Sequence, residues 1–460
     1  MVVIDPAPDR RLQAKAERLG VCMIQADATQ AETLKQARIA HAGEIFVITP
    51  TDEVNLRIAL ELRQQMAGQK NSDAAIRVHL ADIHLREELE RQNEPDRQEP
   101  EAGRLHFFDL FDYEARRVLY TLPLDGPGIR EHDPRSVHMV ILGFGRMGRS
   151  LALRAVKMGH FANGKLLRVS IIDRSAHQQR DRFLFRYPAF EQQKLCDLTF
   201  YEAEAESLTA RDFVKKWADE ANTLLQVFVC LDDDARAVEV GLRLKSILQK
   251  HPEGHLLVHI RSQASRPLLG PALREGVPAL KAGGQIITFG MVDDANCEDM
   301  LGREFNEALA QAIHERFISQ RLADSRRQPA SDPALRPWEK LGEDLRESNR
   351  QQADHIPIKL RAIGCRLVAA TDPGEAVSRF TPAEIELLAR VEHQRWRVER
   401  WLAGWRYGTP SDKARGISEN LVDWEDLHDS IKQYDRDVVM NIPAVVGSRF
   451  KVVRDKALSS

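Results

Sequence analysis

Residues 137–174 carry the pattern that most constrains how this chain can fold: an apolar strand, a glycine turn, a helix and a second strand that ends in an acid. Val137–Leu142 is a short apolar run typical of a buried strand, and the motif Gly-Phe-Gly-Arg-Met-Gly follows it at 143–148. A helix is predicted over Arg149–Met158, and the apolar run 169–172 ends at Asp173. The first glycine makes the turn, the second lets a pyrophosphate approach the backbone, and the third lets helix and strand pack closely. The pattern predicts a doubly wound α/β domain that binds a nucleotide.

The ligand-binding residues predicted from this pattern lie at the turn and at the ends of neighbouring strands. The helix N-terminus offers unpaired N–H groups to a phosphate, and Asp173 stands where a carboxylate can bind ribose hydroxyls. The alternative is a fold that keeps its glycines for packing and holds no ligand. The predicted cofactor-binding residues are Gly143, Phe144, Gly145, Arg146, Met147, Gly148, Asp173, Arg174 and Leu231.

Composition disfavours several classes of protein. The length of 460 residues is enough for about three domains, and the net charge of -3 with no long basic run argues against a nucleic-acid partner. The five cysteines are scattered without CxxC pairs, so we predict neither disulfides nor a metal site, and we expect a reducing, cytoplasmic environment. No apolar run approaches the roughly 18 residues of a membrane span, and no signal sequence opens the chain.

The first 125 residues predict a second domain of the same kind. Short apolar runs at 2–5, 21–24, 44–49, 75–80 and 105–110 alternate with amphipathic helical segments, which is typical of a parallel, doubly wound sheet. The two domains also match at a nearly constant offset. Pairs that correspond are Ile4-Asp5 with Ile172-Asp173, Phe46-Val47 and Asp52 with Phe228-Val229 and Asp234, and Val78-His79 with Val258-His259. The chain therefore holds two copies of one fold.

The first copy begins at the strand before Asp5, so it lacks the strand and glycine turn that open the second. In a doubly wound sheet that strand is the central one, and its absence leaves two open edges inside the sheet. We expect either that the sequence is the C-terminal part of a longer protein, or that its start was assigned late; a degenerate domain completed by another chain is the alternative. The predicted domains are 1–125, 137–320 and 335–455, joined by polar, proline-containing segments at 125–134 and 323–333.

Both copies resemble regulator-of-potassium-conductance (RCK) domains, also called TrkA-N domains. The resemblance rests on the second copy's glycine motif with Asp173, and on Asp5, Ala26–Thr29 and Thr51–Leu56 in the first. It implies a Rossmann-like fold that binds NAD(H), ATP or ADP on the cytoplasmic side of a potassium channel or transporter. It also implies a homo-oligomer without catalytic activity, and perhaps membrane spans in a missing N-terminal segment.

From Pro337 onward the composition changes, since five of the six tryptophans lie in this last quarter and the strand pattern stops. We predict a small, mainly α-helical domain with one helix over 338–354, which Pro357 interrupts. A second helix should begin at the capping box Thr381-Pro-Ala-Glu384 and run to about Leu402.

This region resembles the ryanodine-receptor repeat, or RyR domain. The motifs that carry the resemblance are Trp338–Leu341, Ser348–Arg350, Lys359-Leu360, Glu392–Trp396, Gly404–Gly408 and Leu421–Trp424. His393, Trp396 and Arg400 are predicted on one helical face, where a ring and a guanidinium can hold a planar anion such as a nucleotide. The alternative is that these residues form a core. The candidate ligand site comprises Asn349, Arg350, His393, Arg395, Trp396, Arg400, Trp405 and Tyr407.

The resulting hypothesis is a cytoplasmic ligand-sensing regulator of potassium or other ion transport. An NAD-dependent oxidoreductase is one alternative, but no Tyr-x-x-x-Lys pair, metal cluster or Ser/His/Asp arrangement accompanies the second copy, so no catalytic residue is predicted. A ligand-free assembly scaffold is the other. The sequence leaves the ligand and the regulated ion undetermined.

Overall fold

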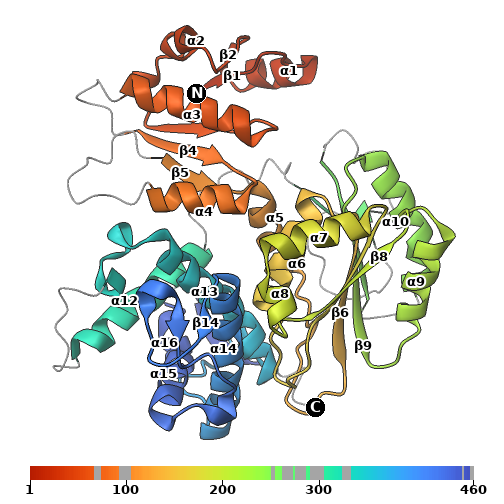
Figure 1. Ribbon diagram of the computed structural model, residues 1–460, viewed down its shortest axis with the longest axis vertical. Helices are drawn as coiled ribbons and strands as arrows, with labels where there is room; N and C mark the ends of the chain where they lie inside the picture. Colours follow the sequence, from red (N-terminus) through yellow and green to blue (C-terminus); the bar gives the residue numbers. More distant parts are fainter. Residues whose placement is uncertain are drawn as a thin grey trace. The chain divides into compact units, whose positions relative to one another are not determined.

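The computed structural model describes residues 1–66, 74–92, 105–249, 254–261, 273–274, 286–290, 305–323, 333–447 and 450–455. The chain forms two compact units, Met1–Phe111 and Asp112–Ser460 (Figure 1). The predicted segment 323–333 lies mostly outside the described residues, as does the start of the helix expected from Cys297.

The first unit alternates strands and helices, as predicted. Five short strands follow one another in the chain, each separated from the next by helix. The elements are β1 (Val2–Ile4), α1 (Arg10–Arg18), β2 (Cys22–Ile24), α2 (Ala31–Gln36), η1 (Ile39–His41), β3 (Glu44–Val47), α3 (Asp52–Met66), β4 (Ala75–His79), α4 (Ile83–Gln92) and β5 (Leu105–Phe108).

The strands of this unit form two separate parallel sheets. β1 pairs only with β2, and the order of the other sheet is β3-β4-β5. Within the described residues no strand joins β1 to β3. This confirms that the first copy lacks the strand that should lie between them.

The split sheet predicts uneven protection of the backbone. Each edge that faces the gap lacks a hydrogen-bonding neighbour, so its amides should open to solvent more easily. In hydrogen exchange, we expect β1 and β3 to exchange at least tenfold faster than their counterparts in the second copy. Equal protection in a dilute monomer would contradict this prediction and make the first unit self-sufficient.

The second unit begins with a complete doubly wound sheet. Its elements are α5 (Leu110–Thr121, which starts at the end of the first unit), β6 (Ser136–Leu142), α6 (Arg146–Met158), β7 (Arg168–Asp173), α7 (Ala176–Arg186), α8 (Ala189–Gln192), β8 (Asp197–Glu202), α9 (Leu208–Ala218), β9 (Thr223–Val229), α10 (Asp234–Leu248), β10 (His255–His259), β11 (Leu273–Arg274) and β12 (Ile286–Phe289). The strand order is β11-β12-β10-β9-β6-β7-β8, and all neighbours are parallel. This is the Rossmann-like order, with β6 at the centre and paired with both β7 and β9.

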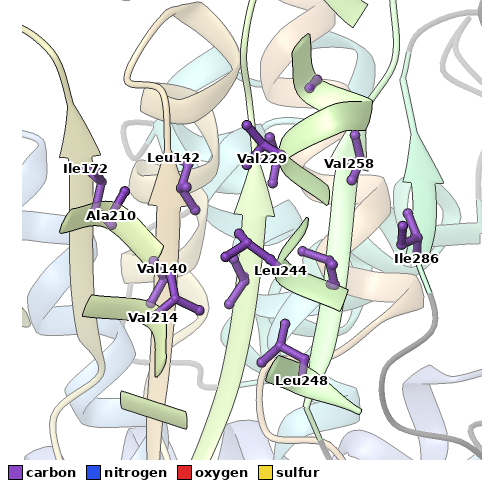
Figure 2. Packing of buried hydrophobic residues seen from close by; sticks show 14 of the residues in the cluster. Val140, Leu142, Ile172, Ala210, Val214, Val229, Leu244, Leu248, Val258 and Ile286 are labelled. Carbon is purple, nitrogen blue, oxygen red and sulfur yellow. The ribbon is translucent and has the colours of Figure 1, made fainter. Parts of the chain in front are cut away.

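The core of this sheet consists of continuous apolar strands covered by helices. Val140 and Leu142 of β6 and Val229 of β9 lie beneath Val214 of α9 and Leu244 of α10 (Figure 2). Each of these side chains is at least nine-tenths buried. Burial of one such side chain stabilises the fold by roughly 1.5–3 kcal/mol, which is why the strands contain almost no polar residues.

The rest of the second unit is mainly helical. Its elements are α12 (Phe305–Ala323), η5 (Pro333–Leu335), η6 (Trp338–Lys340), α13 (Glu343–Ala362), β13 (Cys365–Ala369), α14 (Pro382–Leu402), β14 (Arg406–Tyr407), η7 (Lys413–Arg415), β15 (Ile417–Ser418), η8 (Trp424–Asp426), α15 (Asp429–Met440), α16 (Ile442–Val445) and β16 (Phe450–Arg454). The capping box at Thr381 is present, since its hydroxyl accepts from the Glu384 N–H and the Glu384 carboxylate accepts from the Thr381 N–H.

Two expectations for this region are wrong. Strands do occur, because β13 pairs antiparallel with β16 and β14 pairs parallel with β15. Pro357 does not interrupt the helix either, since α13 continues to Ala362. A proline inside a helix costs about 3 kcal/mol, and the neighbouring Ile356 and Leu360, both buried in the helical core, offset that cost.

Candidate nucleotide site

The glycine turn at the end of β6 is required by the packing of the protein at two of its three glycines. Gly143 has φ +93, and a Cβ there would lie 2.7 Å from the Cys230 carbonyl oxygen. A Cβ on Gly148 would lie 2.3 Å from the Gly143 carbonyl oxygen, closer than any real contact. Neither position can hold another residue without a shift of backbone.

Gly145 differs from the other two. It is the N-cap of α6 in an extended conformation, with φ -71. A Cβ built there would meet only the Asp232 carboxylate, at 3.8 Å, which is an ordinary van der Waals distance. The fold therefore leaves room for a side chain at Gly145, and the open space is available to a group that approaches the turn.

The N-terminus of α6 opens at this turn. No side chain caps the helix at Gly145, so the first-turn N–H groups of α6 receive no cap from a side chain. The positive end of the helix dipole lies at the same place. Uncapped N–H groups and the dipole together favour an anion such as a phosphate.

Asp173 ends β7 and holds the turn in place. Its Oδ2 accepts a hydrogen bond from the Phe144 N–H at 2.8 Å, and its Oδ1 accepts one from the Ser175 N–H at 2.8 Å. An ionised carboxylate has about four acceptor positions. Two remain for ribose hydroxyls, so the bracing of the turn and the binding of a ribose are compatible.

The other predicted residues of this site have different surroundings. The side chain of Phe144 is fully buried against Phe183 and Phe200, so only its backbone faces the turn. Met147 is buried in the core, whereas Arg146 and Arg174 are exposed. The side chain of Leu231 lies next to Gly143, 3.0 Å from the position of a Cβ there.

Three consecutive acids after β9 were missed by the sequence reasoning. Asp233 caps α10 by accepting from the Arg236 N–H at 2.9 Å, and Asp234 accepts from the Arg261 N–H at 2.8 Å. Asp232 is the exposed one, and its carboxylate faces Gly145. Its position directly after a strand, opposite the glycine turn, was the available signal.

Asp232 predicts a measurable repulsion. A carboxylate beside a phosphate subsite disfavours an anionic ligand, although solvent screens the exposed charge. We expect Asp232→Asn to tighten binding of an anionic nucleotide about 1.5- to 5-fold at low salt, with a smaller gain at high salt. Titration calorimetry at two salt concentrations measures this, and Asp219→Asn, far along the chain at the C-cap of α9, serves as the control. Weaker binding by Asp232→Asn would instead assign the acid to ligand recognition.

In the first copy, the acids of the resemblance brace the chain. Asp27 accepts from the Thr29 N–H and hydroxyl, both at 2.8 Å, and the backbone hydrogen bond lowers its pKa most. Asp52 accepts from the N–H groups of Ala81 and Asp82, and buried Asn55 joins Thr49 to the His79 carbonyl oxygen. These contacts tie the end of β3 to the end of β4.

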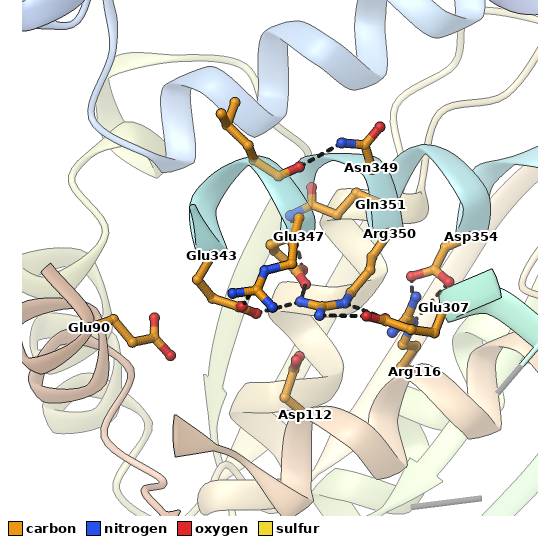
Figure 3. A network of polar contacts seen from close by, with 12 residues as sticks. Glu90, Asp112, Arg116, Glu307, Glu343, Glu347, Asn349, Arg350, Gln351 and Asp354 are labelled. Carbon is orange, nitrogen blue, oxygen red and sulfur yellow. Dashed lines mark hydrogen bonds and ion pairs between the residues drawn. The ribbon is translucent and has the colours of Figure 1, made fainter. Parts of the chain in front are cut away.

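The predicted RyR-domain residues do not form one cluster. Arg350 of α13 pairs with Glu307 of α12 at 2.6 and 2.9 Å and with Glu343 (Figure 3). Asn349 donates to the Leu345 carbonyl oxygen at 2.8 Å. Within the described residues, these contacts satisfy the Arg350 charge internally rather than leaving it for a ligand.

The predicted residues of α14 divide into an inner and an outer group. Arg395 is 2% exposed and donates to Glu392 and Glu399, and the His393 ring contacts the Val422 carbonyl oxygen at 2.9 Å. Burial lowers the pKa of Arg395, but the two carboxylates outweigh that effect and raise it. These inner side chains stabilise the domain.

The outer group lies near the surface. The guanidinium carbon of Arg400 is 4.9 Å from the Trp405 ring centroid and 5.9 Å from that of Trp396. Trp396 in turn stacks on His393 at 5.7 Å. Tyr407 is 59% exposed. Of the predicted set, Trp396, Arg400 and Trp405 are thus brought together in a cation–π arrangement.

A buried ion-pair network joins α6 to α13. Arg154 of α6 is 2% exposed and pairs with Asp112, Glu347 and Asp354, and Arg116 donates to Asp354 at 2.8 Å (Figure 3). Burial lowers the pKa of Arg154, but the three carboxylates outweigh that effect and raise it. Sequence reasoning missed this network; its only local signal is a charge beside the apolar face of α6. The helix that opens at the glycine turn is therefore fixed at its far end to the RyR-side helices.

Comparison with protein families identifies two parts of the chain. The TrkA-N domain model matches residues 1–90, and the RyR domain model matches residues 377–446. Comparison with curated protein sequences gave no match. Within the described residues, no helix is long and apolar enough to cross a membrane, and no three His, Cys, Asp or Glu side chains gather as they would around a metal ion.

Several solved structures are similar to the chain at low identity. The crystal structure of GsuK bound to ADP matches at 16% identity and a TM-score of 0.39, covering 65% of this chain and 61% of that one. The GsuK channel bound to NAD matches at 13% identity and 0.39, covering 84% and 65%, and the GsuK RCK domain at 14% and 0.37, covering 63% and 68%. This chain thus spans about three-fifths of the length of the first of these structures.

Proposed function

We propose that this chain, which carries a TrkA-N domain and an RyR domain, is a ligand-sensing regulator that binds a nucleotide at the glycine turn of its second Rossmann-like fold. The observation that supports this most is Gly145. The packing of the protein requires glycine at 143 and 148 but not at 145, where a side chain would fit. A backbone kept bare beside an uncapped helix N-terminus and an acid at the end of β7 suits a pyrophosphate and its ribose.

The experiment that tests this proposal is titration calorimetry of the chain with NADH, NAD, ATP and ADP. One of the four is expected to bind with one site per chain. Absence of binding by all four would favour the alternative of a ligand-free scaffold. Consumption of NADH without an added partner protein would favour an oxidoreductase instead.

Asp173 is proposed to select the ribose. A 2′-phosphate would place a second negative group next to this half-buried carboxylate, at a cost of roughly 1–4 kcal/mol at moderate effective dielectric, which the exposed Arg174 would reduce. We expect NAD(H) to bind at least about tenfold more tightly than NADP(H). Competition between the two in one calorimetric titration measures the ratio, and a preference for NADP(H) would remove Asp173 as the selecting residue.

The regulated process is proposed to be ion transport, with a potassium channel or transporter as the foremost partner and a cytoplasmic location. The TrkA-N match supports this proposal. A regulator must change between two states that differ in ligand affinity. The Arg154 network gives the nucleotide site a direct mechanical connection to the RyR-side helices. We also propose a homo-oligomer, which light scattering after size-exclusion chromatography tests directly.

The outer residues Trp396, Arg400, Trp405 and Tyr407 remain candidates for a second, nucleotide-like ligand. Arg400 between two indole rings supports this, because a planar base can stack on such a surface. The inner residues Arg350, His393 and Arg395 are proposed to hold the domain together.

A further inference from the structure

A separate cavity lies among the C-terminal helices. Its volume is about 120 Å³, and its walls come from α12, α13, α15 and α16. Most of the lining is apolar, with Phe317 on one side and Val438 and Ile442 on another. Of the residues predicted to bind a ligand in this domain, only Asn349 lines it. The cavity is therefore distinct from the Arg400 and tryptophan surface.

A buried ammonium lies at the wall of this cavity. Lys359 is 0% exposed and forms an ion pair with Glu392. Within the described residues its Nζ makes no well-directed hydrogen bond. An ammonium has three N–H donors, and buried donors without acceptors are costly. Lys359 can therefore donate to a group inside the cavity.

Two amide oxygens on the same helix can accept hydrogen bonds. Asn349 uses its NH₂ group on the Leu345 carbonyl oxygen at 2.8 Å, and Gln352 uses its NH₂ group on Glu392 at 3.2 Å. Among the described residues, neither side-chain oxygen receives a donor. Lys359 and these two amides thus give the cavity both donors and acceptors on one wall, opposite apolar side chains.

The charges around Lys359 favour a neutral ligand. Burial alone would raise the pKa of Glu392, but Arg395 and Lys359 outweigh that effect and hold it well below its usual range, so this carboxylate stays ionised. Arg395 also pairs with Glu399. Two cations therefore face two carboxylates, and an added anion would find the charge already balanced and Glu392 close by.

We propose that this cavity binds a single neutral six-membered ring that carries an amide, of the size of nicotinamide or a pyrimidine base. Its carbonyl oxygen accepts from Lys359, its N–H donates to Asn349 or Gln352, and its ring faces Phe317 and Val438. The size fits, because an apolar cavity of about 150 Å³ can hold benzene. A complete nucleotide is too large to be enclosed. This site does not depend on the nucleotide proposed at the glycine turn.

Calorimetry and saturation-transfer NMR on the whole chain test the proposal with three probes of similar shape: nicotinamide, benzamide and benzene. Nicotinamide and benzamide are expected to bind at least tenfold more tightly than benzene, because only they carry the amide. Equal binding of benzamide and benzene, or no binding of either amide at 10-fold millimolar excess, would overturn it.

Two variants locate the binding. Val438→Phe fills the cavity from the half-buried face of α15 and should abolish binding of all three probes, with the melting temperature as a check on folding. Lys359→Met should remove the preference for amides over benzene; if it does not fold, Val438→Phe still decides the site. Gly145→Val should leave amide binding unchanged. Amide binding that survives Val438→Phe, or is lost in Gly145→Val, would overturn the assignment to this cavity.

Discussion

Replacement of Gly145 by valine is expected to weaken nucleotide binding by well over tenfold while the fold stays intact. The new side chain would occupy the space beside the uncapped end of α6, where a pyrophosphate must approach the backbone. The protein itself tolerates a Cβ there, since the first contact is with Asp232 at 3.8 Å. Calorimetry measures the affinity, and urea unfolding monitored by circular dichroism measures the stability.

A matched control distinguishes a local effect from a general cost of losing glycine. Gly43 also has no neighbour within 4 Å of a Cβ, and it lies in the first unit. Gly43→Val should leave nucleotide affinity unchanged. If Gly145→Val binds nucleotide as the wild type does, the glycine turn is not the phosphate site and the proposed function fails with it.

Replacement of Arg154 by methionine is expected to destabilise the second unit by about 3–5 kcal/mol, because it leaves buried carboxylates without their cation. Asp354 is 1% exposed, and Arg116 would be its remaining partner. The loss should appear as a lower urea midpoint for the unfolding of this unit. It should also recover as the pH falls. Burial alone raises the pKa of Glu347, but the neighbouring cations, Arg154 first, outweigh it and hold that pKa well below its usual range.

The sign of this pH dependence follows from the carboxylate. A carboxyl group whose pKa is depressed in the folded state stabilises the protein above its unfolded pKa and loses that contribution as the pH falls. In Arg154→Met the depression is reduced, so the difference from the wild type should be largest near pH 7 and smaller toward pH 3. A constant difference over that range would contradict the ion-pair account.

Arg243→Met is the matched control for charge removal. Arg243 is 68% exposed and pairs with Glu239 one turn away on α10. Such a surface pair contributes about 0–1 kcal/mol. If Arg154→Met costs no more than Arg243→Met, the network in Figure 3 contributes little and the connection between α6 and α13 rests on apolar packing alone.

These two variants also separate sensing from transmission. Gly145 and Arg154 lie near opposite ends of α6. A conservative change at the far end, such as Arg154→Lys, is expected to retain nucleotide binding but to change how binding alters hydrogen exchange in α13. Such a result would support α6 as the element through which the ligand acts.

Regular features with short sequence spacing were predictable. The alternating strands and helices, the repeat of one fold and the gap left by a missing strand follow from apolar periodicity and from the offset between copies. The capping box at Thr381 and the glycine motif are likewise complete within a few residues. Their geometry depends on local backbone conformation, which the sequence encodes directly.

The use of each charged residue was decided only by tertiary structure. Arg350 and Arg395 resemble ligand-binding residues in the sequence, yet their partners Glu307 and Glu392 satisfy them inside the protein. Pro357 looks like a helix breaker, yet burial of its neighbours keeps α13 continuous. The strength of a charge or a helix break depends on what surrounds it, and that is set by other segments.

By itself, the sequence determined the two α/β folds, the absence of a central strand in the first, the glycine turn with Asp173, and the matches that mark the two ends of the chain. Tertiary structure alone decided that Asp173 braces the turn, that Asp232 faces Gly145, that Arg154 joins α6 to α13, and that a cavity opens beside Lys359. The physical reason is range. Backbone preferences and apolar periodicity act between near neighbours in the chain, whereas ion pairs, burial and cavities arise between residues that only folding brings together.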